Sequence, residues 1–244
     1  FGALELLLQL AVGRGPPGPT EPPRLVVIGS SQARHGVHPR LLEPIEPTAW
    51  NFSEAGSNPR FTLEWYRRLF RPRYPERIVV LYQVDWFLFD DVRLSRRFED
   101  LSYRLSWSDW LRAVAWGELD RRTMVLRATP LLREREGFSD RGSSEYPKAL
   151  AYRGYIPFER EFRPGEPARF DSLKIAPEQV EAFRALVATL HREHRLILFQ
   201  APEFLPGRAA RDPRGQELLE QVAASEGVPF LDYNGALAGP INQD

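Results

Sequence analysis

The sequence predicts an α/β fold: a three-layer sandwich with a central, mainly parallel five-stranded sheet and a helical insertion. Short apolar runs alternate with stretches of helical periodicity, which is the pattern of strands joined by crossover helices. The apolar runs are continuous, as expected for parallel strands that are covered on both faces. The chain has 244 residues, of which 43% are hydrophobic, and this is enough for one such domain with a sizeable core.

Five apolar runs predict the strands, and the first of them is expected in the middle of the sheet. They cover residues 25–29, 48–52, 77–82, 196–200 and 228–232. Polar and glycine-rich residues follow each run, which marks the points where the chain leaves the sheet.

Three stretches predict helices between these strands. Residues 59–70 begin with a proline and carry apolar side chains at helical spacing. Residues 177–194 form one apolar stripe, which predicts a helix that packs on the sheet. Residues 212–226 begin with Asp212, a suitable N-cap, followed by Pro213 at the first helical position.

The first 23 residues read as a separate segment. The stretch "FGALELLLQLAV" is apolar but too short to cross a bilayer by itself, and the linker "GRGPPGPTEPP" follows it. Two interpretations stay open: an amphipathic surface helix, or the trailing end of a membrane helix that begins before Phe1. The absence of an initial methionine favours a fragment or a processed form. The main domain is expected over residues 24–244.

Between Asp90 and Lys174 the alternation of strands and helices stops. We expect an insertion at about residues 91–175, rich in tryptophan and arginine. It is either a packed helical appendage or a wall of the substrate site, because long insertions after a strand often border a site.

Composition excludes several classes of function. Lysine plus arginine and aspartate plus glutamate both number 33, so net charge gives no attraction to nucleic acid. The chain has no cysteine, and its four histidines have no metal-ligand spacing, so we expect no metal. The phosphate-binding motifs of nucleotide proteins are also missing, so we expect no cofactor.

Small and polar residues follow the expected strands, where ligands bind in open parallel sheets. The groups, in strand order, are Gly29-Ser30-Ser31, Gly56 with Asn58, Gln83 with Asp85, Gln200 with Glu203, and Asp232-Tyr233-Asn234. A hydroxyl, a flexible backbone and polar side chains are therefore expected on one rim.

The ordered stretches "VVIGSSQARHGVHP", "AWNFSEAGSNP", "VVLYQVDWFLF" and "GYIP" resemble the SGNH (GDSL-type) hydrolase superfamily. They are most similar to its membrane-anchored, extracytoplasmic branch in bacterial cell envelopes. The resemblance covers roughly residues 24–244. It implies a flavodoxin-like sheet and an extracytoplasmic, membrane-anchored protein.

Carried over residue by residue, the resemblance implies that Ser31 is the nucleophile, with Ser30 in place of the family's aspartate. The oxyanion hole would comprise Ser31, Gly56 and Asp85, where Asp85 stands at the position of an asparagine. An ionised aspartate would repel an oxyanion, so Asp85 must be protonated, turned away or used differently. Ser30, Asn58 and Glu203 are expected to contact the substrate.

The family's general base lies in an Asp-x-x-His motif after the last strand, and this sequence has no such motif. A serine needs a base to become a good nucleophile. We therefore expect a truncated carboxyl end with the catalytic histidine absent from this chain. His35 and His38 are the alternative bases, whereas His191 and His194 are expected to be solvated residues near a helix end, at the amino end of the sheet.

Three functional hypotheses follow. The first is a serine esterase or O-acyltransferase that acts on an acylated cell-envelope carbohydrate or polymer through an acyl-serine intermediate. The second is a non-catalytic binding or assembly module that lacks the histidine base. The third, an anion-binding turn at residues 29–31, has less support because no nucleotide motif accompanies it.

Overall fold

The computed structural model describes residues 19, 21–90, 151–156, 173–202 and 212–236. The expected N-terminal helix, most of the linker, most of the insertion and Glu203 lie outside the described residues. Nearly all of the expected α/β core lies within them.

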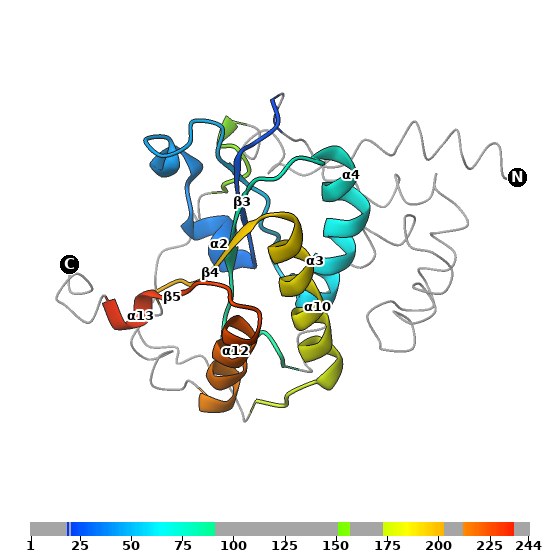
Figure 1. Cartoon of the computed structure of the whole chain (residues 1–244). Coiled ribbons are helices and arrows are strands. Elements are labelled where there is room, and N and C mark those ends of the chain that lie inside the picture. The colour runs from blue at the N-terminus through cyan, green and yellow to red at the C-terminus, as the bar shows by residue number, and fades with distance from the viewer. Residues whose placement is uncertain (1–18, 20, 91–150, 157–172, 203–211, 237–244) are drawn as a thin grey trace, which may run out of the picture.

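The core is one sheet of parallel strands, which confirms the predicted fold class (Figure 1). The strands are β1 (Leu25–Ile28), β2 (Trp50–Asn51), β3 (Val79–Gln83), β4 (Arg195–Gln200) and β5 (Phe230–Asp232). Their order is β2-β1-β3-β4-β5, and each neighbouring pair is parallel. This is the flavodoxin-like order.

Two details of the strands differ from the prediction. β1 is an interior strand, but β3 is the central one, because β4 and β5 both lie beyond it. β2 has two residues instead of the expected five. Its expected start is taken up by a turn, in which both the backbone N–H and the hydroxyl of Thr48 donate to Glu46 Oε1.

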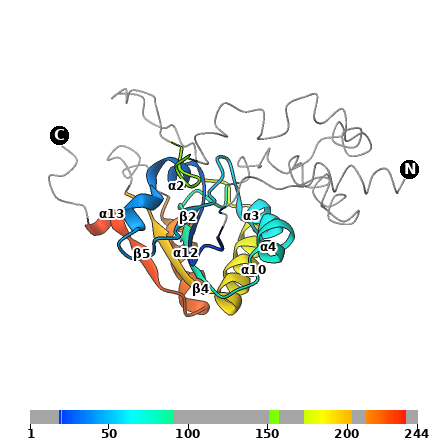
Figure 2. The same ribbon diagram turned by 90° about the horizontal axis from the view of Figure 1, so that it is seen from above.

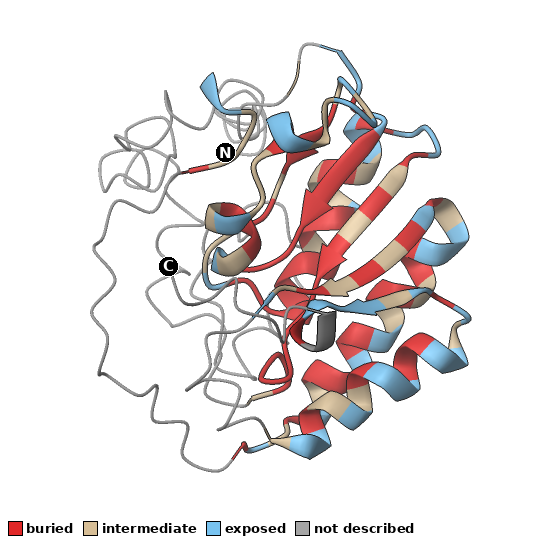
Figure 3. Ribbon diagram, turned by 90° about the vertical axis from the view of Figure 1, so that its left-hand side faces the viewer, coloured by how far each residue is buried: buried red, intermediate tan, exposed pale blue. Residues whose placement is uncertain are grey.

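The two faces of the sheet carry different cores, because side chains along a strand point alternately to opposite faces. Val26, Ile28, Val80 and Tyr82 belong to the larger cluster, which includes the buried side chains of the helices over that face. Leu25 and Val27 belong to a smaller cluster with Ala33 on the opposite face. Figure 3 shows the buried residues concentrated along the strands and the inner sides of the helices.

The helices are short on one face and long on the other (Figure 2). The larger cluster includes side chains from α3 (Pro59–Trp65), the π-helix η2 (Tyr66–Phe70), α10 (Pro177–Glu193) and α12 (Pro213–Ser225). The three-residue α4 (Arg71–Arg73) continues η2. The smaller cluster is covered by α2 (Ser31–Gly36) and η1 (Pro39–Leu42), and α13 (Tyr233–Ala236) follows β5. Asp212 caps α12, as predicted.

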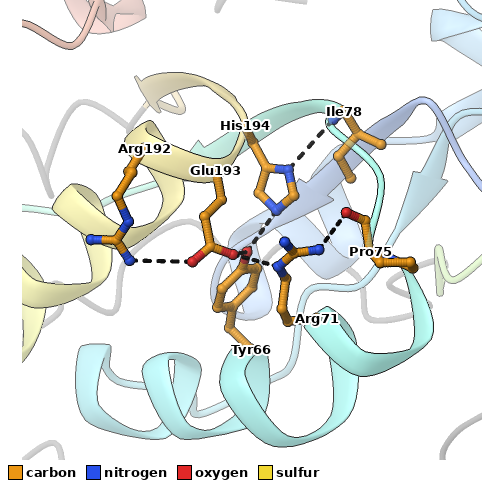
Figure 4. Close-up of polar contacts among 7 residues, drawn as sticks. All are labelled: Tyr66, Arg71, Pro75, Ile78, Arg192, Glu193 and His194. Atoms are coloured by element: carbon orange, nitrogen blue, oxygen red, sulfur yellow. Dashed lines mark hydrogen bonds and ion pairs between the residues drawn. The ribbon is translucent and has the colours of Figure 1, made fainter.

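His194 is buried, so the prediction of a solvated histidine was wrong for this residue. It lies at the amino end of the sheet, as expected, where Ile78 precedes β3 (Figure 4). Its Nε2 is 2.7 Å from the Tyr66 hydroxyl, which is also 2.8 Å from Glu193 Oε2. The partner Tyr66 is 128 residues earlier in the chain, and no local pattern around His194 signals it.

The hydrogen bonds fix where the protons lie in this cluster. Ile78 N–H donates to His194 Nδ1 over 3.4 Å, so Nδ1 is unprotonated and the neutral ring carries its proton on Nε2. Nε2–H can then donate to Tyr66, whose hydroxyl donates to Glu193. Arg71 Nε lies 2.5 Å from Glu193 Oε2 and its guanidinium also donates to the Pro75 carbonyl. The cluster joins the ends of η2 and α10 to the start of β3.

Burial and neighbouring charges set the pKa values of this cluster. Burial, with smaller effects from Arg71 and Arg77, lowers the pKa of His194 despite the opposing charge of Glu193. Burial and the hydrogen bond to Glu193 raise the pKa of Tyr66. Burial alone would raise the pKa of Glu193, but hydrogen bonds from Tyr66, Arg192 and Arg71 outweigh it and the pKa is lowered. The folded state therefore favours neutral histidine.

We expect the protein to lose stability as His194 becomes protonated. A histidine whose pKa is lowered by folding contributes stability above its ordinary pKa of about 6.5, and this contribution is lost as the pH falls through the folded value. Thermal unfolding between about pH 7.5 and about pH 5.5 should show a Tm that falls with pH in the wild type. The slope should be shallower in His194→Gln. The control is His191→Gln, which replaces an exposed histidine of α10 and should keep the wild-type slope. Equal slopes in all three proteins would contradict this account.

Candidate functional site

The candidate site lies where the order of the strands reverses. β1 is followed in the chain by β2 on one side, whereas β3, on its other side, continues to β4 and β5. In open parallel sheets, ligands bind beyond the carboxyl ends of the strands at such a reversal. The residues that follow β1 and β3 are Gly29-Ser30-Ser31 and Val84-Asp85.

The turn at Gly29 is held by the loop that follows β2. The carbonyl oxygen of Gly29 accepts hydrogen bonds from Glu54 N–H at 3.0 Å and from the Ser57 hydroxyl at 2.9 Å. Gly56 lies between these two donors in the chain, so it is brought close to the turn. Its φ of +75° is in the left-handed region that favours glycine, and Gly56 is exposed.

Ser31 is the first residue of α2 and is exposed. Its neighbour Ser30 is buried and caps the helix, with Ser30 Oγ accepting from Gln32 N–H at 3.4 Å. The two serines therefore have different environments: Ser30 belongs to the interior, and Ser31 faces outward. None of the hydrogen bonds of the described residues uses the backbone N–H of Ser31 or of Gly56.

Beneath the turn, Ser30, Gln83 and Asp85 form a buried polar network. Gln83 Oε1 lies 3.2 Å from Ser30 N and 3.0 Å from Ser30 Oγ, and Gln83 Nε2 lies 2.7 Å from Asp85 Oδ1. Asp85 Oδ2 is 3.3 Å from Ser30 Oγ, and the Asp85 side chain is fully buried. The side chain of Asp85 therefore contacts both Ser30 and Gln83.

The side of α2 that faces β2 is also fixed by polar contacts. Arg34 forms a largely buried ion pair with Glu54 at 2.7 Å, which ties α2 to the loop that carries Gly56. The side-chain amide of Asn51 donates to the carbonyls of Ala33 and Val37 at 2.8 and 2.9 Å. Because α2 has only six residues, these contacts rather than its own length hold it in place.

Residues 151–156, which lie within the expected insertion at about residues 91–175, dock beside α2 and β2. Asn51 N–H donates to the Arg153 carbonyl at 2.9 Å, and Ile156 N–H donates to the Arg34 carbonyl at 3.2 Å. Arg153 and Gly154 both have positive φ, of 53° and 89°, in the tight turn that joins Tyr152 to Tyr155. This docked turn includes the Gly-Tyr-Ile part of the "GYIP" stretch.

The histidines differ in their positions. His35 lies four residues after Ser31 on α2, and its Nδ1 is 2.7 Å from the Ile156 carbonyl oxygen. Since a carbonyl only accepts, Nδ1 carries the proton of the neutral ring. His38 Nδ1 instead accepts from Arg40 N–H at 3.1 Å, and its ring packs on Tyr155. Burial and the charge of Arg40 lower the pKa of His38.

The remaining predicted site residues do not all face the turn. Asn58 is buried, and its Oδ1 caps α3 by accepting from Phe61 N–H at 2.8 Å. The substrate contacts of Ser30 and Asn58 stay predictions, and Glu203 lies outside the described residues. Sequence reasoning missed the role of Gln83 inside the network, although Gln83 stood among the polar residues that follow the strands. The sequence does not show that Gln83 is buried beside Gly29, because Gln83 ends β3 whereas Gly29 follows β1.

Neither a metal site nor a membrane span is found within the described ranges. They contain no group of three or more histidine, aspartate or glutamate side chains that could hold a metal ion. None of their helices has the length and apolar character needed to span a membrane.

We expect Gly154→Ala to destabilise the docked turn. A Cβ at residue 154 would lie 1.7 Å from the Asn51 carbonyl oxygen, and the φ of +89° disfavours any side chain. The free energy of unfolding in urea should fall by about 2 kcal/mol or more. Gly36→Ala is the matched control, because nothing lies within 4 Å of a Cβ there. Similar losses in the two variants would contradict the docking described above.

Comparison with known proteins gives remote structural likenesses. No family model matches the chain, and no curated protein matches it. A candidate acylhydrolase from Bacteroides fragilis has a TM-score of 0.40 at 10% identity, covering 96% of this chain and 78% of its own. The lipase/acylhydrolase from Enterococcus faecalis has a TM-score of 0.39 at 12% identity, covering 90% and 81%.

The third similar structure is a variant of Axe2, an acetyl xylan esterase from Geobacillus stearothermophilus. Its TM-score is 0.40 at 13% identity, covering 90% of this chain and 81% of that one. At these scores and identities the likenesses assign neither a family nor an activity to this chain. The proposals below therefore rest on the residues of the chain itself.

Proposed function

We propose that the protein is a serine esterase or O-acyltransferase of the SGNH type, with Ser31 as its nucleophile. One observation carries the proposal: Ser31 is exposed, while its neighbour Ser30 and the turn before it are fixed by hydrogen bonds to two separate chain segments, the loop after β2 and the end of β3. A nucleophile must present its Oγ to a substrate from a rigid backbone, and this turn meets that requirement.

In the proposed reaction, Ser31 Oγ attacks the carbonyl carbon of an ester and its proton passes to a general base. The acyl group is then bonded to Ser31 and the alcohol leaves with a proton. Water or a sugar hydroxyl next attacks the acyl-serine and restores Ser31. The backbone N–H groups of Ser31 and Gly56, which make no hydrogen bond within the described chain, are suited to stabilise the negative oxygen.

Substitution of the two histidines near Ser31 tests which of them is the general base. His35 is the better placed of the two, because the Ile156 carbonyl fixes its proton on Nδ1. If His35 is the base, His35→Gln should reduce kcat by about 100- to 10,000-fold. A variant that keeps wild-type kcat would show that His35 is not the base.

We propose an acylated carbohydrate or polymer of the bacterial cell envelope as the substrate, and a position outside the cytoplasm with a membrane anchor. The resemblance of the turn and loop stretches to the extracytoplasmic SGNH branch supports this proposal. The apolar residues 1–12 and the proline- and glycine-rich residues 13–23 have the composition of an anchor segment joined to a linker. Release of acetate from purified envelope polymers, compared with unrelated esters, tests the substrate class.

We expect Ser31→Ala to abolish ester turnover. Loss of the nucleophile should lower kcat on a small activated acetyl ester by at least about 1,000-fold. The assay uses protein expressed from its complete reading frame. Ser225→Ala, an exposed serine on α12, is the control and should retain wild-type kinetics.

A non-catalytic binding module is the second candidate. The observation that favours it is the engagement of Asp85, since its carboxylate faces Ser30 and Gln83 in a fully buried position. Asp85 then adds no side-chain donor to an oxyanion site. Wild-type protein without ester turnover would favour this second function over the first. Turnover that survives Ser31→Ala would instead show an enzyme whose nucleophile is not Ser31.

A further inference from the structure

The Gln83 side chain contacts the turn that carries Ser31 through two hydrogen bonds to Ser30. It is the last residue of β3, it is buried, and β3 is hydrogen-bonded directly to β1. Its Oε1 accepts from both the backbone N–H and the hydroxyl of Ser30, at 3.2 and 3.0 Å. One amide oxygen therefore fixes the backbone immediately before Ser31.

The turn and Gln83 also fit each other in shape. A Cβ on Gly29 would lie 2.7 Å from Gln83 Cβ and 3.0 Å from Gln83 Oε1, which is too close for a side chain. The glycine at residue 29 thus makes room for Gln83, and Gln83 fills the space beside the turn. A shorter or differently shaped side chain at residue 83 would leave that space empty.

The orientation of the Gln83 amide is determined from its other side. Gln83 Nε2 donates to Asp85 Oδ1 at 2.7 Å and to Gln32 Oε1 at 3.3 Å. If the amide were flipped, its oxygen would face the Asp85 oxygen at that distance, and Ser30 N–H would lose its acceptor. Asp85 therefore directs Oε1 of Gln83 at Ser30.

We infer that Gln83 is a positioning residue for the Ser31 nucleophile, with Asp85 holding the Gln83 amide in its working orientation. This inference rests on the proposed function, because it assigns Gln83 to the reaction of Ser31. A displacement of the nucleophile by about 1 Å can reduce the rate by about 100-fold. The effect should fall on kcat, because Gln83 is buried behind Ser30 and does not face the substrate side.

The test exchanges the amide and the carboxyl group. Gln83→Glu keeps the length of the side chain and its acceptor oxygen but replaces the donor that Asp85 needs. We expect kcat to fall by about 10- to 100-fold with KM nearly unchanged. In the double variant Gln83→Glu with Asp85→Asn, residue 85 supplies the amide donor and residue 83 the carboxylate acceptor. The kcat of the double variant should be at least about tenfold higher than that of Gln83→Glu alone.

Two further variants separate positioning from folding. Gln179→Glu places the same acid at a buried position on α10, and it should lower Tm without lowering kcat. Gln83→Met keeps much of the volume but removes all four hydrogen bonds of the amide. It should lower kcat as Gln83→Glu does, and Asp85→Asn should not rescue it. If Gln83→Glu does not fold, the double variant and Gln83→Met provide the test.

The outcomes distinguish this inference from the proposed function. Turnover that depends on Ser31 but is insensitive to Gln83→Glu and Gln83→Met would overturn the positioning role alone. A loss of kcat that Asp85→Asn does not rescue in Gln83→Glu would overturn the part assigned to Asp85. Absence of Ser31-dependent turnover in the wild type would overturn the proposed function, and the inference with it.

Discussion

The backbone turn at Gly29 and Ser30 is the constraint on which the candidate site depends. The Gly29 carbonyl is held by the loop after β2, and the Ser30 N–H is held by Gln83 at the end of β3. The helix that follows has only six residues and is too short to be stable by itself. Ser31 therefore takes its position from contacts made by neighbouring strands.

This arrangement uses buried polar groups and must therefore satisfy them. Ser30, Gln83 and Asp85 are all buried, and their hydrogen bonds join them into one network. The network explains how an aspartate is accommodated in a fully buried position at residue 85. The side chain of Asp85 contacts Ser30 and Gln83 within this network.

The fold follows from local sequence patterns, but the partners within the site do not. The apolar runs and helical stripes of residues 25–29 and 177–194 predict the parallel sheet, because their periodicity reflects burial. His194 was misjudged because its partner Tyr66 comes from a distant helix. Gln83 was found in the polar group after its strand. Its role depends on the space that a glycine leaves at residue 29, and only the three-dimensional structure shows that Gln83 fills this space.

The central claim is that Ser31, and not Ser30, is the reactive serine. A fluorophosphonate reagent tests it directly, because the attacking serine oxygen bonds to phosphorus and fluoride leaves. Mass spectrometry of the intact protein followed by peptide mapping should show one phosphonyl group, located on Ser31. The same treatment of Ser31→Ala should leave the protein unmodified. An adduct on another residue, or no adduct on the wild type, would contradict the account.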